Sequence, residues 1–523
     1  MYLKANSPHA TAAGKSVIGF NVINGKEVEG DLSLIQSKSA VDSRDLVGMF
    51  PDSGEKDVAR AAKAAADTLP SWSNTPAATR EGVVQRTAGI LTTHRAKIAR
   101  IITREIGMTS MEAEGEVQEA IDACAFFITE SRQAQARTDR PGASAQRRPV
   151  GVCGVLATGS SPLAAPGRKI LPAILCGNTV AWKPSDNAPT AAYLFLRAMM
   201  EAGLPAGVVN TVNGRGRAGC GKHFLAGLDK GLYQSFSFVG SRALGRIVGE
   251  TCGRNLIVPS LDLAGKGAMM VMPDADLNLA VEEALHAAFG HAGQRSLGLA
   301  TILVHEGCAA AFKKAFLDRV GSLEVGNPLT DPTVAYGPMI NARSATAFRE
   351  HWEKGRGEGA TLLTGGDQWT EANRTSQVKG NVGHGHYMQP CVWEGVTPTM
   401  ELFHNQVHGP TVNLSTFADF DEALSWIAAA SFGPANSLFT QDQALMTRFL
   451  RECRSDIATL NSASPNPAAS LPFAGHGTHP GGQSAIDGFT RWQATNGTRL
   501  ETASPNQAAT VLESTLQTDW DSL

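Results

Sequence analysis

The chain has 523 residues. A chain of this length usually folds around more than one hydrophobic core, so we expect two or three domains. Lys and Arg number 46 against 49 Asp and Glu, which gives a formal net charge of −3. This balance argues against nucleic-acid and anionic-membrane binding, since both need a basic excess. The apolar stretches are too short to span a bilayer, and the N-terminal residues lack the apolar core of a secretory signal.

Composition indicates a well-packed globular protein, because 42% of the residues are hydrophobic and only 18% are charged. The 8 cysteines are scattered without a CxxC pair or metal-ligand spacing. In a long chain such cysteines are typical of reduced, mostly buried thiols. We therefore expect a cytoplasmic protein without a disulfide framework and without a metal site.

Helical and strand patterns alternate in an order that predicts an α/β protein. Residues 54–137 carry Ala-rich segments in which apolar residues recur every three or four positions, as in amphipathic helices. From residue 150, short apolar strands alternate with helices, and a second such run extends from about 266 to 470. This alternation predicts parallel, doubly wound sheets in two blocks that meet at a ligand site. The polar residues after 499 predict a loosely held tail.

Two glycine-containing segments follow predicted strands and suit a dinucleotide. Gly214–Gly219 reads GRGRAG and matches GxGxxG, although that pattern alone is equally typical of a tight turn. In FSFVGSRALG a strand ends at Gly240 and a helix begins at Ser241. The free N–H groups of such a helix end can bind a pyrophosphate.

A third segment, WKPSD, also follows a predicted strand. Lys183 and Asp186 stand where an ammonium and a carboxylate can bind ribose hydroxyls. By itself the segment would equally be a surface turn formed by Pro184 and Ser185. Three such segments in order favour a dinucleotide site.

Ordered motifs along most of the chain resemble those of the NAD(P)-dependent aldehyde dehydrogenase superfamily. They are RPVGVCGVLATGSSPL, LPAILCGNTVAWKPSD, AGLPAGVVNTVNG, FSFVGS, LDLAGK, AFGHAGQRS, GPMIN and HGPTVNL, and they cover roughly residues 30–500. The resemblance implies a Rossmann-type cofactor domain, an α/β catalytic domain and a small β bridging element used in homodimers or homotetramers. The implied boundaries are 1–129 with 151–265 for the cofactor domain, 266–470 for the catalytic domain, 130–150 with 480–500 for the bridging element, and 501–523 for a C-terminal tail.

The chemistry of the family is covalent. A cysteine thiolate attacks the aldehyde, hydride passes to the nicotinamide, a carboxylate-activated water releases the acid, and an asparagine helps hold the oxyanion. The aligned positions here are Ser296 for the cysteine, Asp262 for the glutamate and Ser160 for the asparagine. The interval 296 − 262 = 34 matches the family spacing. The resemblance therefore implies NAD(P)+-dependent oxidation of an aldehyde to a carboxylic acid that is strongly impaired, since a lost oxyanion donor alone costs about 10²–10³ in rate.

The cofactor-binding positions keep more of the family's residues than the catalytic positions do. In QVHGP, Gln406 and His408 replace the glutamate and the aromatic residue of Glu-x-Phe-Gly-Pro. Asp186 replaces a glutamate near the adenosine ribose, and its charge favours NAD over NADP. The candidate cofactor-binding residues are Lys183, Ser185, Asp186, Gly214, Gly219, Gly240, Ser241, Gln406 and His408.

Three functions remain open from the sequence. The first is oxidation of a small-molecule aldehyde through an atypical site, and the second is a catalytically silent, cofactor-binding paralogue that acts as a structural or regulatory partner. The third is an esterase with Ser296 as nucleophile, which needs a base such as His291 or His408. We favour an inert Ser296. The Ala-, Ser- and Pro-rich segments 156–166 and 463–472 predict a small, weakly polar substrate tunnel.

Overall fold

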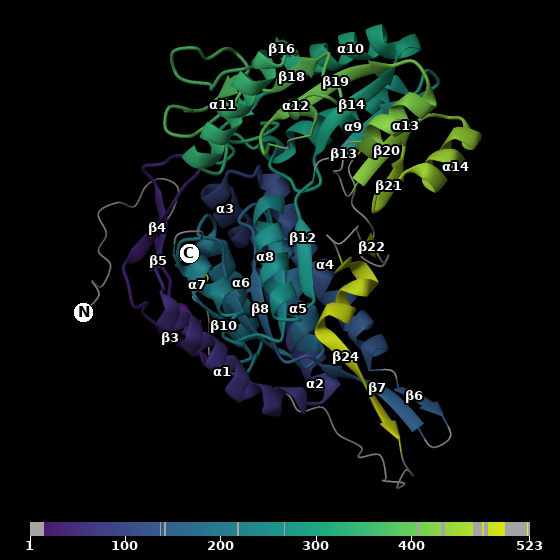
Figure 1. Ribbon diagram of the computed structural model, residues 1–523. Helices are drawn as coiled ribbons and strands as arrows, with labels where there is room; N and C mark the ends of the chain where they lie inside the picture. Colours follow the sequence, from purple (N-terminus) through teal and green to yellow (C-terminus); the bar gives the residue numbers. More distant parts are fainter. Residues whose placement is uncertain are drawn as a thin grey trace.

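The structure is a computed structural model, and it describes residues 15–135, 137–140, 143–216, 219–265, 267–404, 407–429, 435–463, 473–474, 480–496 and 520. Two large sheets lie in separate lobes, and a small sheet projects from one of them (Figure 1). Helices alternate with strands in both large sheets, which confirms the predicted α/β class. No helix in these ranges is both long and apolar enough to cross a membrane.

The described chain begins with five short strands that the sequence patterns did not reveal. They are β1 (Val17–Ile18), β2 (Asn21–Ile23), β3 (Lys26–Val28), β4 (Leu34–Lys38) and β5 (Leu46–Pro51). Strands this short show little alternation of apolar and polar positions. β1, β5 and β4 form a sheet of their own. A buried ion pair, Arg104 Nε to Asp45 Oδ2 at 2.7 Å, ties this sheet to the helices that follow.

Four helices occupy the region in which amphipathic helices are predicted. They are α1 (Glu55–Ser73), α2 (Ala77–Thr93), α3 (Arg95–Ile106) and α4 (Ser110–Ala134). α4 starts with a capping box, in which Thr109 and Glu112 exchange side chain-to-backbone hydrogen bonds. α4 packs along α5 (Ala164–Leu175), and this packing places it beside the first large sheet.

The first large sheet has the strand order β12-β11-β8-β9-β10-β2-β3. Its parallel strands are β8 (Val152–Leu156), β9 (Thr179–Lys183), β10 (Val209–Thr211), β11 (Ser235–Gly240) and β12 (Pro259–Leu263), with α5, α6 (Pro189–Glu201), α7 (Cys220–Ala226) and α8 (Arg242–Arg254) between them. β9 and β10 lie on one side of β8, and β11 and β12 lie on the other. The winding therefore reverses between β8 and β11, which is where open α/β sheets bind ligands.

The second large sheet has the order β16-β18-β19-β14-β13-β20-β21, parallel except for β16 at its edge. Its elements are β13 (Gly267–Val271), α9 (Leu277–Phe289), η1 (Gly290–Gly293), β14 (Leu299–His305), α10 (Glu306–Gly321), α11 (Ala342–Gly357), β16 (Thr361–Thr364), β18 (Cys391–Glu394), α12 (Glu401–His404), β19 (Thr411–Phe417), α13 (Phe420–Ala429), β20 (Ala435–Phe439), α14 (Gln443–Glu452) and β21 (Ile457–Leu460). β15 (Val325–Gly326) and β17 (Val378–Lys379) pair beside it.

The projecting sheet is antiparallel and joins segments far apart in sequence. It consists of β6 (Arg137–Arg140), β7 (Ala143–Pro149) and β24 (Thr490–Asn496), preceded by β22 (Phe473–Ala474), β23 (Pro480–Gly481) and η2 (Gly482–Phe489). α4 continues to Ala134, so the strands begin after the expected boundary at 130. In Figure 1 this sheet extends away from both lobes.

The prediction of a loosely held C-terminal tail is wrong at Trp520. This indole is only 6% exposed and stacks on His94, with the ring centroids 3.9 Å apart. Its Nε1–H donates to Glu201 Oε2 at 3.1 Å. A tryptophan combines a large apolar surface with one hydrogen-bond donor, and Trp520 uses both here.

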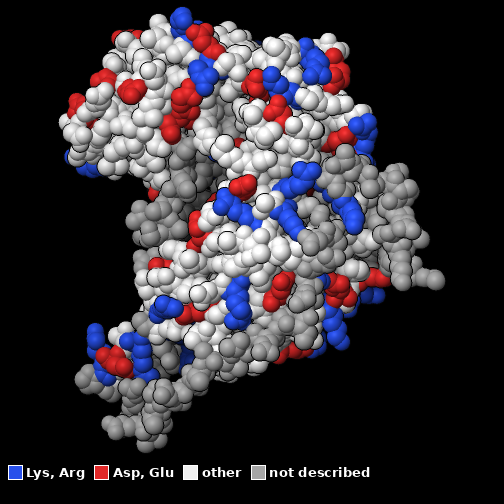
Figure 2. All heavy atoms as spheres, turned by 180° about the vertical axis from the view of Figure 1, so that it is seen from behind, with Lys and Arg blue, Asp and Glu red and all other residues white. Residues whose placement is uncertain are grey.

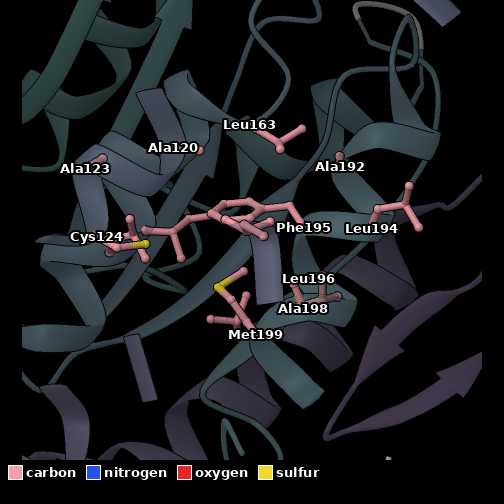
Figure 3. Packing of buried hydrophobic residues seen from close by; sticks show 14 of the residues in the cluster. Ala120, Ala123, Cys124, Leu163, Ala192, Leu194, Phe195, Leu196, Ala198 and Met199 are labelled. Carbon is pink, nitrogen blue, oxygen red and sulfur yellow. The ribbon is translucent and has the colours of Figure 1, made fainter. Parts of the chain in front are cut away.

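The core between α4, α5 and α6 is packed from one large ring and many small side chains. Figure 3 shows Phe195 of α6 close to Leu163, with Ala120, Ala123 and Cys124 of α4 on one side and Met199 below. Alanines on α4 let the helix backbones approach closely, and Phe195 then fills the remaining space without any exposure. α4 is thereby held rigidly next to α5.

We expect Phe195→Ala to lower the free energy of unfolding by about 3–5 kcal/mol, because the deletion leaves a cavity in a close-packed core. Urea unfolding followed by circular dichroism measures this. Leu450→Ala removes a side chain that is 52% exposed and should change stability by less than about 0.5 kcal/mol. Equal effects of the two substitutions would contradict this account of the core.

Candidate active site

The three candidate catalytic residues come from three elements. Ser160 lies in the loop after β8, Asp262 lies in β12, and Ser296 lies in the loop between η1 and β14. Within the sheet Asp262 pairs with Val239 of β11. Ser160 therefore follows β8 on one side of the point where the winding reverses, and Asp262 lies on β12, the second strand on the other side.

Backbone hydrogen bonds join the loop of Ser296 to the end of β12. The Gly265 N–H donates to the Ser296 carbonyl oxygen at 3.1 Å, and the Gly267 N–H donates to the Gly298 carbonyl oxygen at 2.9 Å. Gly265 follows Asp262 by three residues. The structure thus brings the positions of Asp262 and Ser296 close together.

A left-handed turn precedes Ser296. His291 (φ 51°), Ala292 (φ 52°) and Gly293 (φ 65°) all have positive φ, which costs a residue with a Cβ roughly 1–2 kcal/mol. A Cβ on Gly293 would lie 1.9 Å from the Gly409 carbonyl oxygen, so only glycine fits there. The Gly409 N–H also donates to the Gly293 carbonyl oxygen at 3.2 Å, and this bond holds the HGP segment against the turn.

Gln294 fixes the other end of this turn. Its Nε2 donates to the carbonyl oxygens of His291 at 3.1 Å and Pro338 at 3.3 Å, and its Oε1 accepts from the Ile340 N–H at 2.9 Å. Every polar atom of this buried amide is thereby used. The GPMIN segment identified in the sequence acts as the support of the Ser296 loop.

The loop of Ser160 is stabilised by side-chain oxygens. Ser160 Oγ lies 3.1 Å from Thr158 Oγ1, and the Ser160 N–H donates to the same Thr158 oxygen at 3.3 Å. The neighbouring Ser161 hydroxyl donates to the Glu116 carboxylate at 3.0 Å. Ser160 is half-buried, so its hydroxyl is positioned but not enclosed.

Two glutamates of α4 hold both loops. Glu116 Oε1 accepts from the N–H groups of Leu163 at 2.9 Å and Ala164 at 2.8 Å, and so caps the start of α5. Glu112 Oε1 accepts from the His291 N–H at 2.6 Å. Glu112 and Glu116 are four residues apart, which is about 6 Å along the helix axis. α4 therefore sets the spacing between the Ser160 loop and the Ser296 loop.

Sequence reasoning missed these glutamates. Glu112, Glu116 and Glu119 recur at intervals of four and three residues, which places them on one helix face. Three glutamates on a helix face that packs against other elements indicate that these carboxylates bond to neighbouring segments.

A buried lysine lies next to Asp262. Lys169 Nζ donates to Ser260 Oγ at 3.1 Å, and Lys169 is only 2% exposed. Burial lowers the pKa of Lys169, while the charge of Asp262 opposes that shift. The Asp262 carboxylate thus has the Lys169 ammonium group as a neighbour.

Two arginines also approach the site, and both are ion-paired. Arg295 donates from NH2 to Glu112 Oε1 at 3.1 Å, and Arg168 of α5 pairs with Glu119. The expectation of a weakly polar substrate tunnel stays a prediction. Residues 464–472 lie outside the described residues.

The structure does not support a Ser296–His291 pair. His291 is buried, and neither of its ring nitrogens has a hydrogen-bond partner among the described residues. Burial lowers the pKa of His291 to about 4, so its ring is neutral near pH 7. His408 lies in the turn that precedes β19.

The thiols supply no substitute nucleophile. All eight cysteines are free, six of them buried. Burial raises the pKa of the thiols of Cys124, Cys153, Cys176, Cys220, Cys252, Cys308 and Cys391. Since the thiolate is the reactive form, these cysteines are unreactive near neutral pH.

The WKPSD residues lie at the end of β9. Lys183 is buried, and its Nζ donates to the Pro184 carbonyl oxygen at 2.7 Å. Ser185 Oγ accepts from the Asn187 N–H at 3.3 Å. Asp186 Oδ2 accepts from the Gly216 N–H at 3.2 Å, which connects this loop to the loop after β10.

The remaining cofactor candidates follow neighbouring strands. Gly214 (φ 149°) lies after β10, and Gly219 caps α7. Gly240 ends β11, and Ser241 caps α8 by accepting from the Leu244 N–H at 3.4 Å. Gln406 lies outside the described residues. The groups that the structure describes thus follow β9, β10 and β11, consistent with one nucleotide lying along this edge.

Known proteins resemble the chain over nearly its whole length. The sequence model of the aldehyde dehydrogenase family matches residues 29–495. The α-ketoglutaric semialdehyde dehydrogenase of Bacillus subtilis is 30% identical over 462 residues, 87% of this chain and 92% of that protein. The malonate-semialdehyde dehydrogenase 1 of Shouchella clausii is 30% identical over 483 residues, which are 90% of this chain and 95% of that protein. A crystal structure of an NAD-dependent aldehyde dehydrogenase from Sinorhizobium meliloti matches with a TM-score of 0.86 at 25% identity, covering 94% of this chain and 97% of that one.

Glu116 should make stability depend on pH. Burial, with the charge of Glu119, raises the pKa of Glu116 to about 7. A carboxyl with a higher pKa in the folded chain holds its proton more tightly there, so stability is greatest below about pH 4.3 and falls as the pH rises to about 7. We expect Glu116→Gln to reduce this fall by about 2 kcal/mol.

Urea unfolding of wild type and E116Q at about pH 5 and about pH 8 measures this difference. Glutamine keeps an Oε1 acceptor for the N–H groups of α5. Glu114→Gln, at a side chain of α4 that is 48% exposed, is the control and should not alter the pH dependence. An unchanged pH dependence in E116Q would contradict the assignment.

Proposed function

Because the chain belongs to the aldehyde dehydrogenase family, we propose that it binds NAD, or NADP, together with a small-molecule aldehyde, and oxidises the aldehyde to a carboxylic acid only slowly. The observation that carries this proposal is the hydroxyl of Ser296 at the nucleophile position. An unactivated hydroxyl has almost no ionised fraction at neutral pH, whereas a thiol has a few per cent. The supports of the Ser296 loop are intact, so the weakness is chemical.

The cofactor positions support nucleotide binding. The N-terminus of α8, which Ser241 caps, suits a pyrophosphate. Lys183 and Asp186 would bind a ribose. When bound, the nicotinamide would supply a hydride acceptor. Because Asp186 is engaged by the Gly216 N–H, its repulsion of a 2′-phosphate is weakened, and this leaves NADP open beside NAD.

The side chains of this chain would act as follows. Asp262, only 7% exposed, would orient a water at the carbonyl carbon. Ser160 would donate one hydroxyl hydrogen bond to the carbonyl oxygen. Each change from the family pattern lowers the rate, by about 10²–10³ for the oxyanion donor and up to about 10²–10⁴ for the base. These factors do not simply multiply, since the groups act together.

A catalytically silent, cofactor-binding paralogue is the second candidate. It is favoured by the contrast between an intact framework, such as Gln294 with all its hydrogen bonds, and replacements at Ser160, Asp262 and Ser296. Such a protein would act as a structural or regulatory partner. The esterase alternative lacks a supporting base at His291.

We also propose that the β6–β7–β24 sheet serves assembly into a homodimer or homotetramer. Trp492 on β24 is 55% exposed, and the Arg147 guanidinium lies 4.8 Å from its ring centroid. An exposed aromatic residue with an arginine is typical of the energetic centre of an interface.

Restoring the family residues tests the proposed chemistry. We expect the triple substitution Ser160→Asn, Asp262→Glu and Ser296→Cys to raise the rate of NADH formation from aldehydes by about 10²-fold or more. Ser296→Ala serves as the control and should leave the slow wild-type rate nearly unchanged. Rapid acid production by the wild-type protein would contradict the proposal.

Cofactor binding is tested without turnover. We expect NAD at about 100 times its Kd to stabilise the protein by about 2.7 kcal/mol, seen as a rise in Tm. Lys183→Met should weaken NAD binding by about tenfold in calorimetry, because an ammonium donor to the ribose is lost. Lys222→Met, at an exposed residue of α7, is the control. Failure of both nucleotides to bind would refute the proposal.

A further inference from the structure

The projecting sheet of β6, β7 and β24 is basic, although the chain carries a formal net charge of −3. Seen from behind, basic side chains gather on this sheet (Figure 2). Its three strands contain one aspartate, Asp139, and five arginines, namely Arg137, Arg140, Arg147, Arg148 and Arg491. Asp139 pairs with Arg137. Arg148 and Arg491 have no carboxylate partner among the residues that the structure describes.

Arg148 and Arg491 lie directly opposite each other on β7 and β24. Residues opposite one another in an antiparallel pair lie on the same face, with their Cβ atoms about 4.5–5.5 Å apart, and like charges at such positions are destabilising. Arg148 Nε donates to Gln493 Oε1 at 2.9 Å, a bond that leaves both positive charges unbalanced. An anion between the two guanidinium groups would remove this repulsion and accept charge-assisted hydrogen bonds from both.

A cavity of about 410 Å³ adjoins Arg491, and this volume is typical of pockets that hold small molecules. Three apolar residues, Val150, Leu228 and Ile257, form part of its wall. Leu256 and Val258, the neighbours of Ile257, are 94% and 83% exposed, so apolar surface is also exposed next to the cavity. The cavity therefore suits the apolar body of a ligand whose anionic group lies at the arginines.

Polar groups in the wall are compatible with an anion. Gln234 Oε1 accepts from the Val152 N–H at 2.9 Å, and its Nε2 has no acceptor among the described residues. Asn255 Nδ2 donates to Asp229 Oδ1 at 2.8 Å, and Arg254 pairs with the same carboxylate at 3.5 Å. The charge of Asp229 is thus already balanced by an arginine other than Arg491.

The cavity lies at the opposite edge of the first large sheet from the proposed active site. Val150, Gln234 and Ile257 stand one or two residues before β8, β11 and β12, which are parallel. Ser160 and Ser241 follow β8 and β11 instead. β8 alone has five residues and is about 16 Å long. A ligand in the cavity would therefore be remote from Ser296 and the cofactor.

The cavity is also separate from the surface that we propose for assembly. Trp492 follows Arg491 on β24, and successive residues of a strand point to opposite faces. Arg147, whose guanidinium lies over the Trp492 ring, is on the face of Trp492. The two unpaired arginines thus belong to the other face of the sheet.

We infer that this cavity binds a small molecule with an apolar body of a few carbon atoms and one anionic group, such as a carboxylate, held between Arg148 and Arg491. The apolar wall would exclude water from the body of the ligand, and the two guanidinium groups would select for its charge. The site is independent of the proposed oxidation of an aldehyde.

Calorimetry with hexanoate and the full-length protein tests this inference. We expect hexanoate to bind wild type at least about tenfold more tightly than Arg491→Gln or Arg148→Gln, because each change removes a charge-assisted hydrogen bond. Hexanamide, which lacks the charge, and acetate, which lacks the apolar body, should each bind wild type at least about tenfold more weakly than hexanoate does. Hexanoate bound at the proposed active site would remain in R491Q and is thereby distinguished.

Arg140→Gln is the matched control, since it removes an exposed arginine from the opposite face of the same sheet and should leave hexanoate binding unchanged. Ile257→Glu places a carboxylate in the wall and should abolish binding, and circular dichroism checks that each variant is folded. Equal hexanoate affinity of wild type and R491Q, or equal affinity for hexanoate and hexanamide, would overturn the inference. A change of oligomeric state in R491Q without a change in hexanoate affinity, seen by sedimentation, would also overturn it and identify the cavity as a contact between copies of the chain.

Discussion

The spacing of two buried carboxylates on one helix determines the geometry of the site. Glu112 accepts a hydrogen bond from the turn before Ser296, and Glu116 accepts hydrogen bonds from the loop after Ser160 and the start of α5. An α-helix is stiff over one turn, so these loops keep a fixed separation. A carboxylate in low dielectric is costly unless it is bonded, which makes each of these contacts hard to give up. The packing of α4 against α2, α3 and α5 keeps it in place.

The framework and the chemistry of this site have diverged. Gly293 fits against the Gly409 carbonyl oxygen, and Gln294 uses all its hydrogen bonds, so the loop of Ser296, the proposed nucleophile loop, is firmly held. The group that it presents is nevertheless an alcohol. Residues that shape a loop contribute to folding stability whether or not the protein turns over substrate. Residues that react contribute only to rate, so they can change without loss of the fold.

The fold was largely predictable because its main signals are local. Alternating strands and amphipathic helices indicated the parallel sheets, and the order of the motifs indicated the family. The five N-terminal strands were missed because strands of a few residues have no readable periodicity. The docking of Trp520 was missed for another reason. Its partners His94 and Glu201 come from distant helices, and composition alone suggested only a polar tail.

The site was predictable only in part. The sequence by itself determined which side chains stand at 160, 262 and 296, because these are facts of covalent structure, and the resemblance predicts that they take the places of an asparagine, a glutamate and a cysteine. The tertiary structure alone decided that Glu112 would bond a residue 179 positions away, and that Arg168 and Arg295 would be neutralised by glutamates of α4. No local pattern encodes such contacts, since they arise only when the packing of α4 against α5 and against the loop before β14 brings distant charges within a few ångströms.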